Sequence, residues 1–191
     1  LSYEASDDVT INAQAAKGFR LGGVNDRLNL PQCSDADEAL FGPFAGSFDD
    51  ETLWNYEVGL KSQFGRGVTF NAAAFYTDIS DLQVTLDAGT CSSRLVFNVP
   101  KAHTQGIEFE LAAQPVENFD LSLSGSLVEA EFDSTLPGAL AATTGIRDGN
   151  RLPSVPKFQL SATGVYSVPI DASGSEAFFV ASFQHVGSRY T

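Results

Sequence analysis

Long runs in which apolar and polar side chains alternate constrain this sequence more than any other feature. In the clearest run, residues 54–64, Trp54 and Tyr56 fall on one side, and Asn55 and Glu57 fall on the other. An alternation with a period of two residues gives a β-strand one apolar face and one polar face. The helical period of about 3.6 residues is hard to find in the chain. The sequence therefore predicts an all-β fold.

The length of these runs indicates where the strands would lie. The seven runs cover residues 9–19, 54–64, 68–82, 105–114, 119–132, 157–168 and 177–186. Strands of soluble proteins usually contain about five or six residues, and these runs are roughly twice as long. About ten residues form a strand that crosses a lipid bilayer at a tilt of about 45°. We therefore predict antiparallel transmembrane strands whose apolar faces meet lipid.

The connections between the runs alternate strictly between long and short. Long polar segments cover residues 21–51, 83–104 and 131–156, and short turns cover residues 65–67, 115–118 and 169–176. This alternation is typical of a membrane β-barrel with long loops outside the cell and short turns in the periplasm. A soluble secreted β-sandwich that binds carbohydrate remains an alternative, as does a porin-like barrel without gating.

Composition limits the other classes of protein. No window contains eighteen consecutive apolar residues, which excludes a transmembrane helix. The mean hydropathy of −0.04 is compatible with barrel strands, because their polar and apolar residues average out. A net charge of −13 argues against nucleic acid as a partner, since phosphate binding needs concentrated lysine and arginine.

Five segments of the chain resemble TonB-dependent outer-membrane receptors, in that family's order. The segments are KGFRLGGVN at 17–25, NYEVGLK at 55–61, AAFYTDISDLQ at 73–83, QGIEFE at 105–110 and NRLPSVP at 150–156. The resemblance implies part of a 22-stranded barrel in the outer membrane of a Gram-negative bacterium. In that family an N-terminal plug fills the barrel, and the TonB complex energises import of iron chelates, cobalamin or other scarce nutrients.

The expected domain is residues 1–191 as a partial barrel of about seven strands, without the plug and the terminal strands. The expected function is ligand-gated uptake of a scarce nutrient such as a ferric siderophore, with these residues supplying barrel wall and outer ligand-binding loops. The partners implied by the resemblance are membrane lipid, the nutrient and the TonB complex, the last through the absent plug region.

The sequence holds no catalytic signature. A Gly-x-Ser-x-Gly elbow, a His-Glu-x-x-His motif and a phosphate-binding Gly-rich loop are all missing, so we expect no enzyme activity and no cofactor. His103 and His185 are interpreted as surface or strand-end histidines. The acidic residues at 35–38 and 49–51 lack the spacing of a calcium loop and are interpreted as a solvated charge run, so no metal site is expected.

The polar faces of the strands carry the residues expected inside the barrel. These are Glu57, Lys61, Glu108 and Glu110. A carboxylate that faced lipid would cost up to a few kcal/mol, so these side chains should point into the lumen. Their roles are expected to be charge pairing with one another and with the plug, with substrate contact as the alternative.

The outer loops carry the candidate ligand contacts and two cysteines. The candidate contacts are Phe41, Phe44, Phe48, Arg94, Arg147 and Arg151. The phenylalanines would either pack a loop core or contact ligand, and the arginines would either meet an anionic chelate or form charge pairs at the rim. Cys33 and Cys91 lie in the two loops that flank one hairpin, so we expect them to emerge side by side and form a disulfide.

Overall fold

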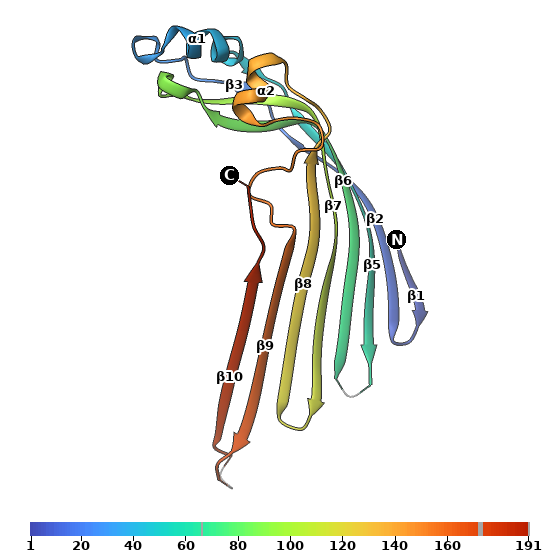
Figure 1. Ribbon diagram of the computed structural model, residues 1–191. Coiled ribbons are helices and arrows are strands. Elements are labelled where there is room, and N and C mark those ends of the chain that lie inside the picture. The colour runs from blue at the N-terminus through green and yellow to red at the C-terminus, as the bar shows by residue number, and fades with distance from the viewer. Residues whose placement is uncertain (66, 172–173, 191) are drawn as a thin grey trace.

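The computed structural model describes residues 1–65, 67–171 and 174–190, and its main feature is one antiparallel sheet of eight strands (Figure 1). The strands lie in the order β1-β2-β5-β6-β7-β8-β9-β10. Their bounds are β1 Ser2–Ser6, β2 Val9–Arg20, β5 Glu51–Phe64, β6 Val68–Asp87, β7 Arg94–Val116, β8 Phe119–Phe132, β9 Phe158–Pro169 and β10 Glu176–Val186. The sheet is open, with β1 and β10 at its edges, as expected for part of a larger barrel.

The prediction of long antiparallel strands is confirmed, and each of the seven alternating runs lies within a strand apart from Lys157 at the start of the sixth. The eighth strand, β1, was missed because its five residues are too few for an alternation to stand out. It is held by antiparallel pairing with the start of β2, where Ser2 lies opposite Asn12. The expected turns at 65–67 and 169–176 include positions 66, 172 and 173, which lie outside the described residues.

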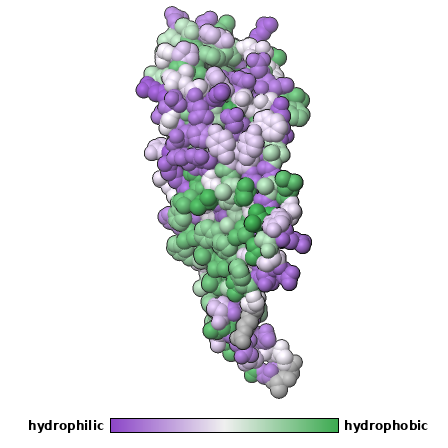
Figure 2. Space-filling view, turned by 90° about the vertical axis from the view of Figure 1, so that its right-hand side faces the viewer, coloured by the Kyte–Doolittle hydropathy of each residue, from purple (hydrophilic) through white to green (hydrophobic). Residues whose placement is uncertain are grey.

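The strand register places apolar side chains on one face of the sheet and polar side chains on the other. One row across five strands consists of Ala13, Val58, Ala74, Ile107 and Leu127. Its large members are exposed, with relative accessibilities of 57% for Val58 and 51% for both Ile107 and Leu127. In the space-filling view, hydrophobic residues gather in the lower half of the molecule and hydrophilic residues predominate above them (Figure 2).

No second sheet packs against these exposed side chains within the described part of the chain, and the only other sheet has two short strands, β3 Gly23–Val24 and β4 Ser47–Phe48. A soluble sandwich buries one face of each sheet in a dry core. The sandwich alternative is therefore wrong for this chain.

The segment 83–104 was expected to be a loop, and this expectation is wrong. Strands β6 and β7 continue through it as a hairpin and remain paired as far as Asp87 opposite Arg94. The prediction failed because the alternation changes phase near Pro100, which lies opposite Asp81, a residue with a φ of 56°. On the Val116 side of this point the nearest buried side chain of β7 is Ala102, and on the Arg94 side it is Val99. These residues are three positions apart, and not two or four, so the buried positions change phase here.

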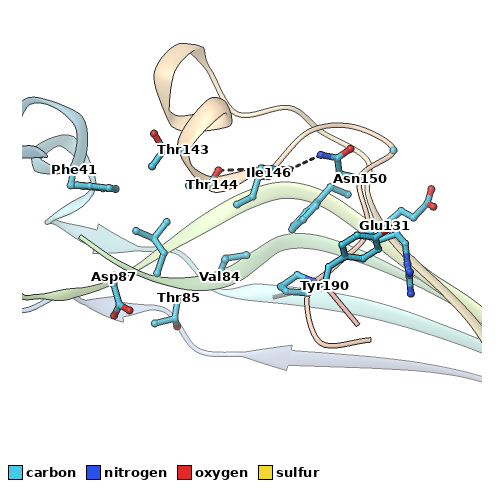
Figure 3. Close-up of a pocket in the computed structure, with 16 residues that line it drawn as sticks. Phe41, Val84, Thr85, Asp87, Glu131, Thr143, Thr144, Ile146, Asn150 and Tyr190 are labelled. Atoms are coloured by element: carbon cyan, nitrogen blue, oxygen red, sulfur yellow. Dashed lines mark hydrogen bonds between the residues drawn. The ribbon is translucent and has the colours of Figure 1, made fainter. Parts of the chain in front are cut away.

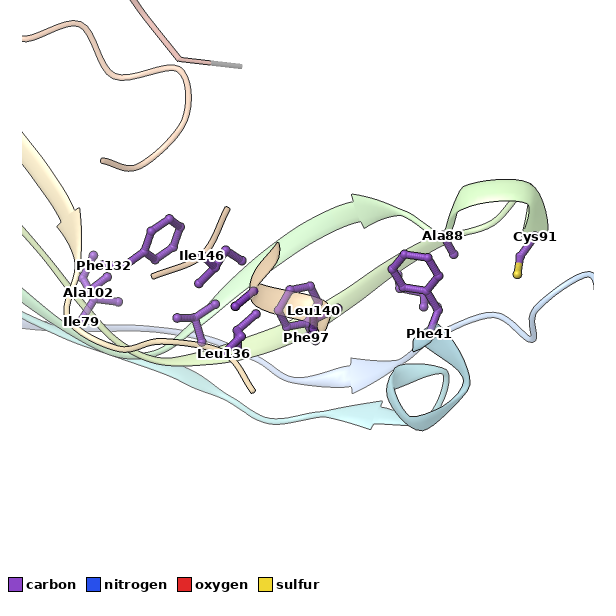
Figure 4. Close-up of a cluster of buried hydrophobic side chains, with 13 residues drawn as sticks. Phe41, Ile79, Ala88, Cys91, Phe97, Ala102, Phe132, Leu136, Leu140 and Ile146 are labelled. Carbon is purple, nitrogen blue, oxygen red and sulfur yellow. The ribbon is translucent and has the colours of Figure 1, made fainter. Parts of the chain in front are cut away.

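The buried core of the described structure lies at the loop end of the sheet, not along the strands (Figure 4). It joins the upper β6–β7 hairpin to two short helices, α1 (Asp35–Phe41) and α2 (Gly138–Thr144). The side chains of the core include Phe41, Leu95, Phe97, Leu136, Leu140 and Ile146. Both helices were missed in the sequence because seven residues carry too little periodicity. No helix in the described ranges has the length and apolarity needed to cross a membrane.

Candidate ligand-binding site

A cavity of about 890 Å³ opens at the loop end of the sheet (Figure 3). It lies between the upper part of β6, the helix α1, the end of β8 and the segment 133–157 that connects β8 to β9. Phe41 is at one end of the cavity in Figure 3, and Glu131 and Tyr190 are at the other. The remaining lining residues are Val84, Thr85, Leu86, Asp87, Phe132, Thr143, Thr144, Gly145, Ile146, Gly149, Asn150, Arg151 and Pro153. We call this cavity the outer pocket.

The outer pocket combines an apolar wall with a small set of polar groups. The wall is built from Phe41, Val84, Leu86, Phe132 and Ile146. Neutral hydrogen-bonding groups come from threonines of β6 and α2 and from the amide of Asn150. A mainly apolar cavity with a few placed polar groups is the usual form of a small-molecule site. The size and composition of the outer pocket therefore suit a compact organic ligand or metal chelate.

The polar end of the outer pocket is organised around Arg151. Its backbone pairs with that of Glu131 in an isolated antiparallel bridge, which continues the edge of β8. The Arg151 Nη2 donates a hydrogen bond to the Val155 carbonyl oxygen at 2.8 Å, and its Cζ lies 4.9 Å from the centre of the Tyr190 ring. These contacts fix the guanidinium against an aromatic face, where a cation–π interaction is favourable.

A disulfide and a carboxylate hold the other wall of the outer pocket in place. Cys33, just before α1, is bonded to Cys91 at the tip of the β6–β7 hairpin. Beside this bond, the Asp37 carboxylate accepts hydrogen bonds from the Thr90 backbone N–H at 3.0 Å and from the Thr90 hydroxyl at 2.5 Å. Gly89 has a φ of 51°, and a Cβ there would lie 2.8 Å from the Asp37 carboxylate. The hairpin tip therefore requires glycine at this position.

The amides of Gln83, Asn98 and Asn25 add a second set of ties between the segment 21–50 and the hairpin. The Gln83 Nε2 donates to the carbonyl oxygens of Leu21 at 3.0 Å and Asp49 at 3.1 Å. Asn98 Nδ2 donates to Asp49 O at 3.0 Å. The Asn25 Nδ2 donates to Val96 O at 2.7 Å, while its Oδ1 accepts from Val96 N at 2.8 Å. We call the segment 21–50 with the hairpin 83–98 the clamped lobe.

The segment 133–150 joins the sheet differently from the clamped lobe. Its hydrogen bonds to β7 in the described structure lie at its root, where Asp133 N donates to Lys101 O at 3.0 Å and Lys101 N donates to the Ser134 hydroxyl at 3.2 Å. Farther out, Leu136, Leu140 and Ile146 meet the clamped lobe through apolar contacts in the core. The side of the outer pocket formed by the clamped lobe is thus fixed by a covalent bond. The side formed by the segment 133–150, the docked side, is held against the lobe by apolar contacts.

The structure places the three candidate phenylalanines inside the loops. Phe41 is 3% exposed and belongs both to the core and to the lining of the outer pocket. Phe44 packs against Phe97, with ring centres 5.6 Å apart. Phe48 covers Gly23, where a Cβ would lie 2.9 Å from the ring. Of the two roles considered, packing of a loop core describes the environment of all three rings.

The three candidate arginines do not converge on one point. Arg151 lines the outer pocket, as described above. Arg94 Nε lies 3.2 Å from Asp87 Oδ1 in a solvent-exposed ion pair beside the cavity. Arg147 is exposed in the segment 133–150 and does not line the outer pocket. Tyr190 and Glu131 could not be identified as site residues from the sequence, because only the tertiary fold brings them to Arg151.

The residues expected in the lumen share the polar face of the sheet. Glu57, Lys61, Glu108 and Glu110 occupy register rows that alternate with the apolar rows. The Glu57 carboxylate accepts a hydrogen bond from Gln14 Nε2 at 3.3 Å. Lys61 and Glu110 lie opposite the same residue, Asn71, on either side of it. These contacts are consistent with a polar interior surface.

The two histidines lie far apart on the sheet. His103 Nδ1 is 2.7 Å from Asp133 Oδ1, and its ring stacks on Tyr76 at 5.8 Å. His185 lies 5.8 Å from the ring of Phe158. Within the described ranges, no three histidine, cysteine or acidic side chains approach closely enough to hold a metal ion.

The Asp37–Thr90 contact predicts a pH dependence of the clamped lobe. Hydrogen bonds from Thr90 lower the pKa of Asp37 from its ordinary value of 3.8. A carboxyl group whose pKa is lowered in the folded state stabilises the fold at pH values above its ordinary pKa. This contribution to stability is lost as the pH falls through the lowered pKa. We expect the protection of the Thr90 amide, corrected for intrinsic hydrogen exchange, to fall below about pH 4. Asp37→Asn should remove this pH dependence. If the protection of the Thr90 amide varied with pH in the same way in this variant, the dependence would not arise from Asp37.

Comparison with known proteins agrees with this architecture. The family model described as "TonB dependent receptor-like, beta-barrel" matches residues 1–191. The pesticin receptor of Yersinia pestis is 27% identical over 156 residues, which make up 82% of this chain and 20% of that receptor. The pesticin receptor of Yersinia enterocolitica matches to the same extent.

Two solved structures share the fold. The ferric yersiniabactin uptake receptor FyuA from Yersinia pestis superimposes with a TM-score of 0.68 and 24% identity, covering 99% of this chain and 25% of that one. The ferric preacinetobactin receptor BauA from Acinetobacter baumannii gives a TM-score of 0.66 and 17% identity over the same shares. The chain therefore spans a fifth to a quarter of the length of these relatives.

Proposed function

The chain belongs to the TonB-dependent receptor β-barrel family, whose members lie in the outer membrane of Gram-negative bacteria, and from this premise we propose that its receptor takes up a ferric siderophore or a similar iron chelate. Members of this family transport their cargo and do not transform it. In this proposal, the residues described here supply barrel wall and the outer part of the ligand site. The TonB complex would act through a plug region outside these residues.

The observation that carries the proposal is the outer pocket. It lies at the loop end of strands whose apolar faces are exposed, so it would open towards the outside of the cell when those faces meet lipid. Its volume of about 890 Å³ is within the usual range of small-molecule sites, roughly 300–1,000 Å³. The names of FyuA and BauA describe receptors for ferric siderophores, which supports the same class of cargo here.

We assign different roles to the candidate contact residues. Arg151 would contact the ligand, because it lines the outer pocket, and the buried ring of Phe41 would support the apolar wall of that pocket from behind. Phe44 and Phe48 would support the clamped lobe from within, since they pack against Phe97 and Gly23. Arg94 and Arg147 would act at the rim of the site, where they remain exposed.

Receptor-dependent iron uptake tests this proposal. The full-length receptor should restore growth and import of radioactive iron in a Gram-negative strain that lacks its own siderophore receptors. Arg151→Ala should weaken binding of the imported chelate by roughly tenfold, since it removes the guanidinium at the polar end of the outer pocket. Lys157→Ala is the matched control, because it also removes a positive charge but from outside the outer pocket. The Lys157 Nζ lies 3.7 Å from Glu129 Oε1. Absence of any receptor-dependent iron import would refute the proposed function.

A further inference from the structure

The charged groups of the outer pocket nearly cancel. The charged residues among its lining are Asp87, Glu131 and Arg151. The Asp87 carboxylate is paired with Arg94 beside the cavity. Arg151 is directed to the Val155 carbonyl and the Tyr190 ring, so part of its hydrogen-bonding capacity is already used. The cavity therefore presents no cluster of free cations.

The loops around the outer pocket add negative charge. The segment 21–50 contains six carboxylates and one arginine: Asp26, Asp35, Asp37, Glu38, Asp49 and Asp50 against Arg27. In the segments 81–101 and 131–157, acidic and basic residues are equal in number. A surface dominated by one sign of charge repels ligands of the same sign and attracts those of the opposite sign. An anionic ligand would thus meet repulsion before it reached the cavity.

Apolar and neutral groups make up the rest of the lining. The apolar wall described above offers rings and branched chains. The hydroxyl groups of Thr143 and Thr144 donate to the carbonyl oxygens of Ala139 and Leu140, and the Asn150 amide donates to the Gly145 carbonyl oxygen, so these polar groups add no charge to the lining. Burying an ion without compensating partners is costly, whereas burying apolar surface is favourable. The wall therefore favours a ligand whose outer surface is largely uncharged.

We infer that the outer pocket takes an iron chelate of zero or positive net charge with a substantial apolar surface, and that it discriminates against polyanionic chelates. This inference rests on the proposed function and narrows its class of cargo. Recognition would come from contact with the apolar wall and from hydrogen bonds to Asn150 and Arg151. Glu131 would oppose negative charge at the polar end of the cavity, beside Arg151.

Binding of three iron complexes to the full-length receptor in detergent tests the inference. The probes are an uncharged ferric trihydroxamate, a monocationic ferric trihydroxamate and a trianionic ferric tris-catecholate. We expect the uncharged or the cationic complex to bind at least about tenfold more tightly than the tris-catecholate. Tighter binding of the tris-catecholate, in a receptor that supports iron import, would overturn the inference and leave the proposed function standing. If none of the three complexes binds to a receptor that supports iron import, the inference is refuted and the proposed function stands, whereas absence of any receptor-dependent iron import refutes both.

Two variants show whether the discrimination arises in the outer pocket. Glu131→Gln removes one negative charge from the lining and should reduce the preference for the uncharged complex over the tris-catecholate by roughly threefold to tenfold. Asp148→Asn removes the same charge from an exposed position that does not line the cavity, and should leave the preference unchanged. Equal effects of the two substitutions would contradict the assignment to the outer pocket.

Discussion

Leu123→Arg is expected to destabilise the assembled barrel by about 2–4 kcal/mol, the cost of an arginine that faces lipid near the bilayer midplane. Leu123 lies in a register row with Leu111 and Ala162, midway between the aromatic residues Tyr56 and Tyr166 near the two ends of the apolar face. The guanidinium would have to lie in hydrocarbon or distort the surrounding lipid. Folding of the full-length receptor into lipid vesicles, titrated with urea, measures the effect.

The neighbouring residue provides a matched control for this substitution. Ser124 is on the opposite face of the same strand, where it is paired with Glu110. Ser124→Arg adds the same side chain next to a carboxylate on the polar face, so it should cost less than about 1 kcal/mol. If the two variants were equally stable, the assignment of the lipid-facing and lumen-facing sides would be wrong.

The second large effect is expected from removal of the disulfide. Replacing both Cys33 and Cys91 by serine should destabilise the clamped lobe by about 2–4 kcal/mol, because the cross-link restricts the unfolded chain over a sequence separation of 58 residues. Local opening should then expose the segment 21–50 to proteases added to intact cells. Mass spectrometry of the released peptides would locate the cleavage sites.

Reduction of the native receptor provides the control for the cysteine variant. A reductant should make the wild-type segment 21–50 as sensitive to protease as that of the double serine variant, and it should not increase the sensitivity of that variant further. Cleavage that is equally slow in the oxidised receptor, the reduced receptor and the variant would show that the hydrogen bonds of Gln83, Asn98 and Asn25 hold the clamped lobe without the disulfide.

The strands of this protein were predictable because their environment imposes a pattern on them. A strand with lipid on one side and a polar space on the other must alternate, and runs such as Phe119–Phe132 do so as far as Leu127. The upper part of β7 was not predictable, because Pro100 and Asp81 change the phase of the alternation while the pairing continues. In the sequence alone, a break in the apolar–polar alternation looks the same as the end of a strand, so this part of β7 was predicted to be a loop.

The outer pocket was less predictable than the strands. Phe41 and Arg151 were candidates because aromatic and basic residues in long loops suit ligand contact, and the fold brings both to one cavity. Glu131 and Tyr190 are ordinary residue types at ordinary positions, and 59 residues separate them along the chain. Their contribution depends on the path of the segment between β8 and β9, which local sequence does not determine.

The unequal attachment of the two sides of the outer pocket has a consequence for how receptors of this design can diversify. Changes to the docked side, such as a different side chain in place of Thr143 near the end of α2, would reshape the cavity while the disulfide and the amide ties kept the opposite side intact. New cargo preferences could then arise by exchange of a single surface segment. The strands, which must satisfy lipid and neighbouring strands at once, would not need to change.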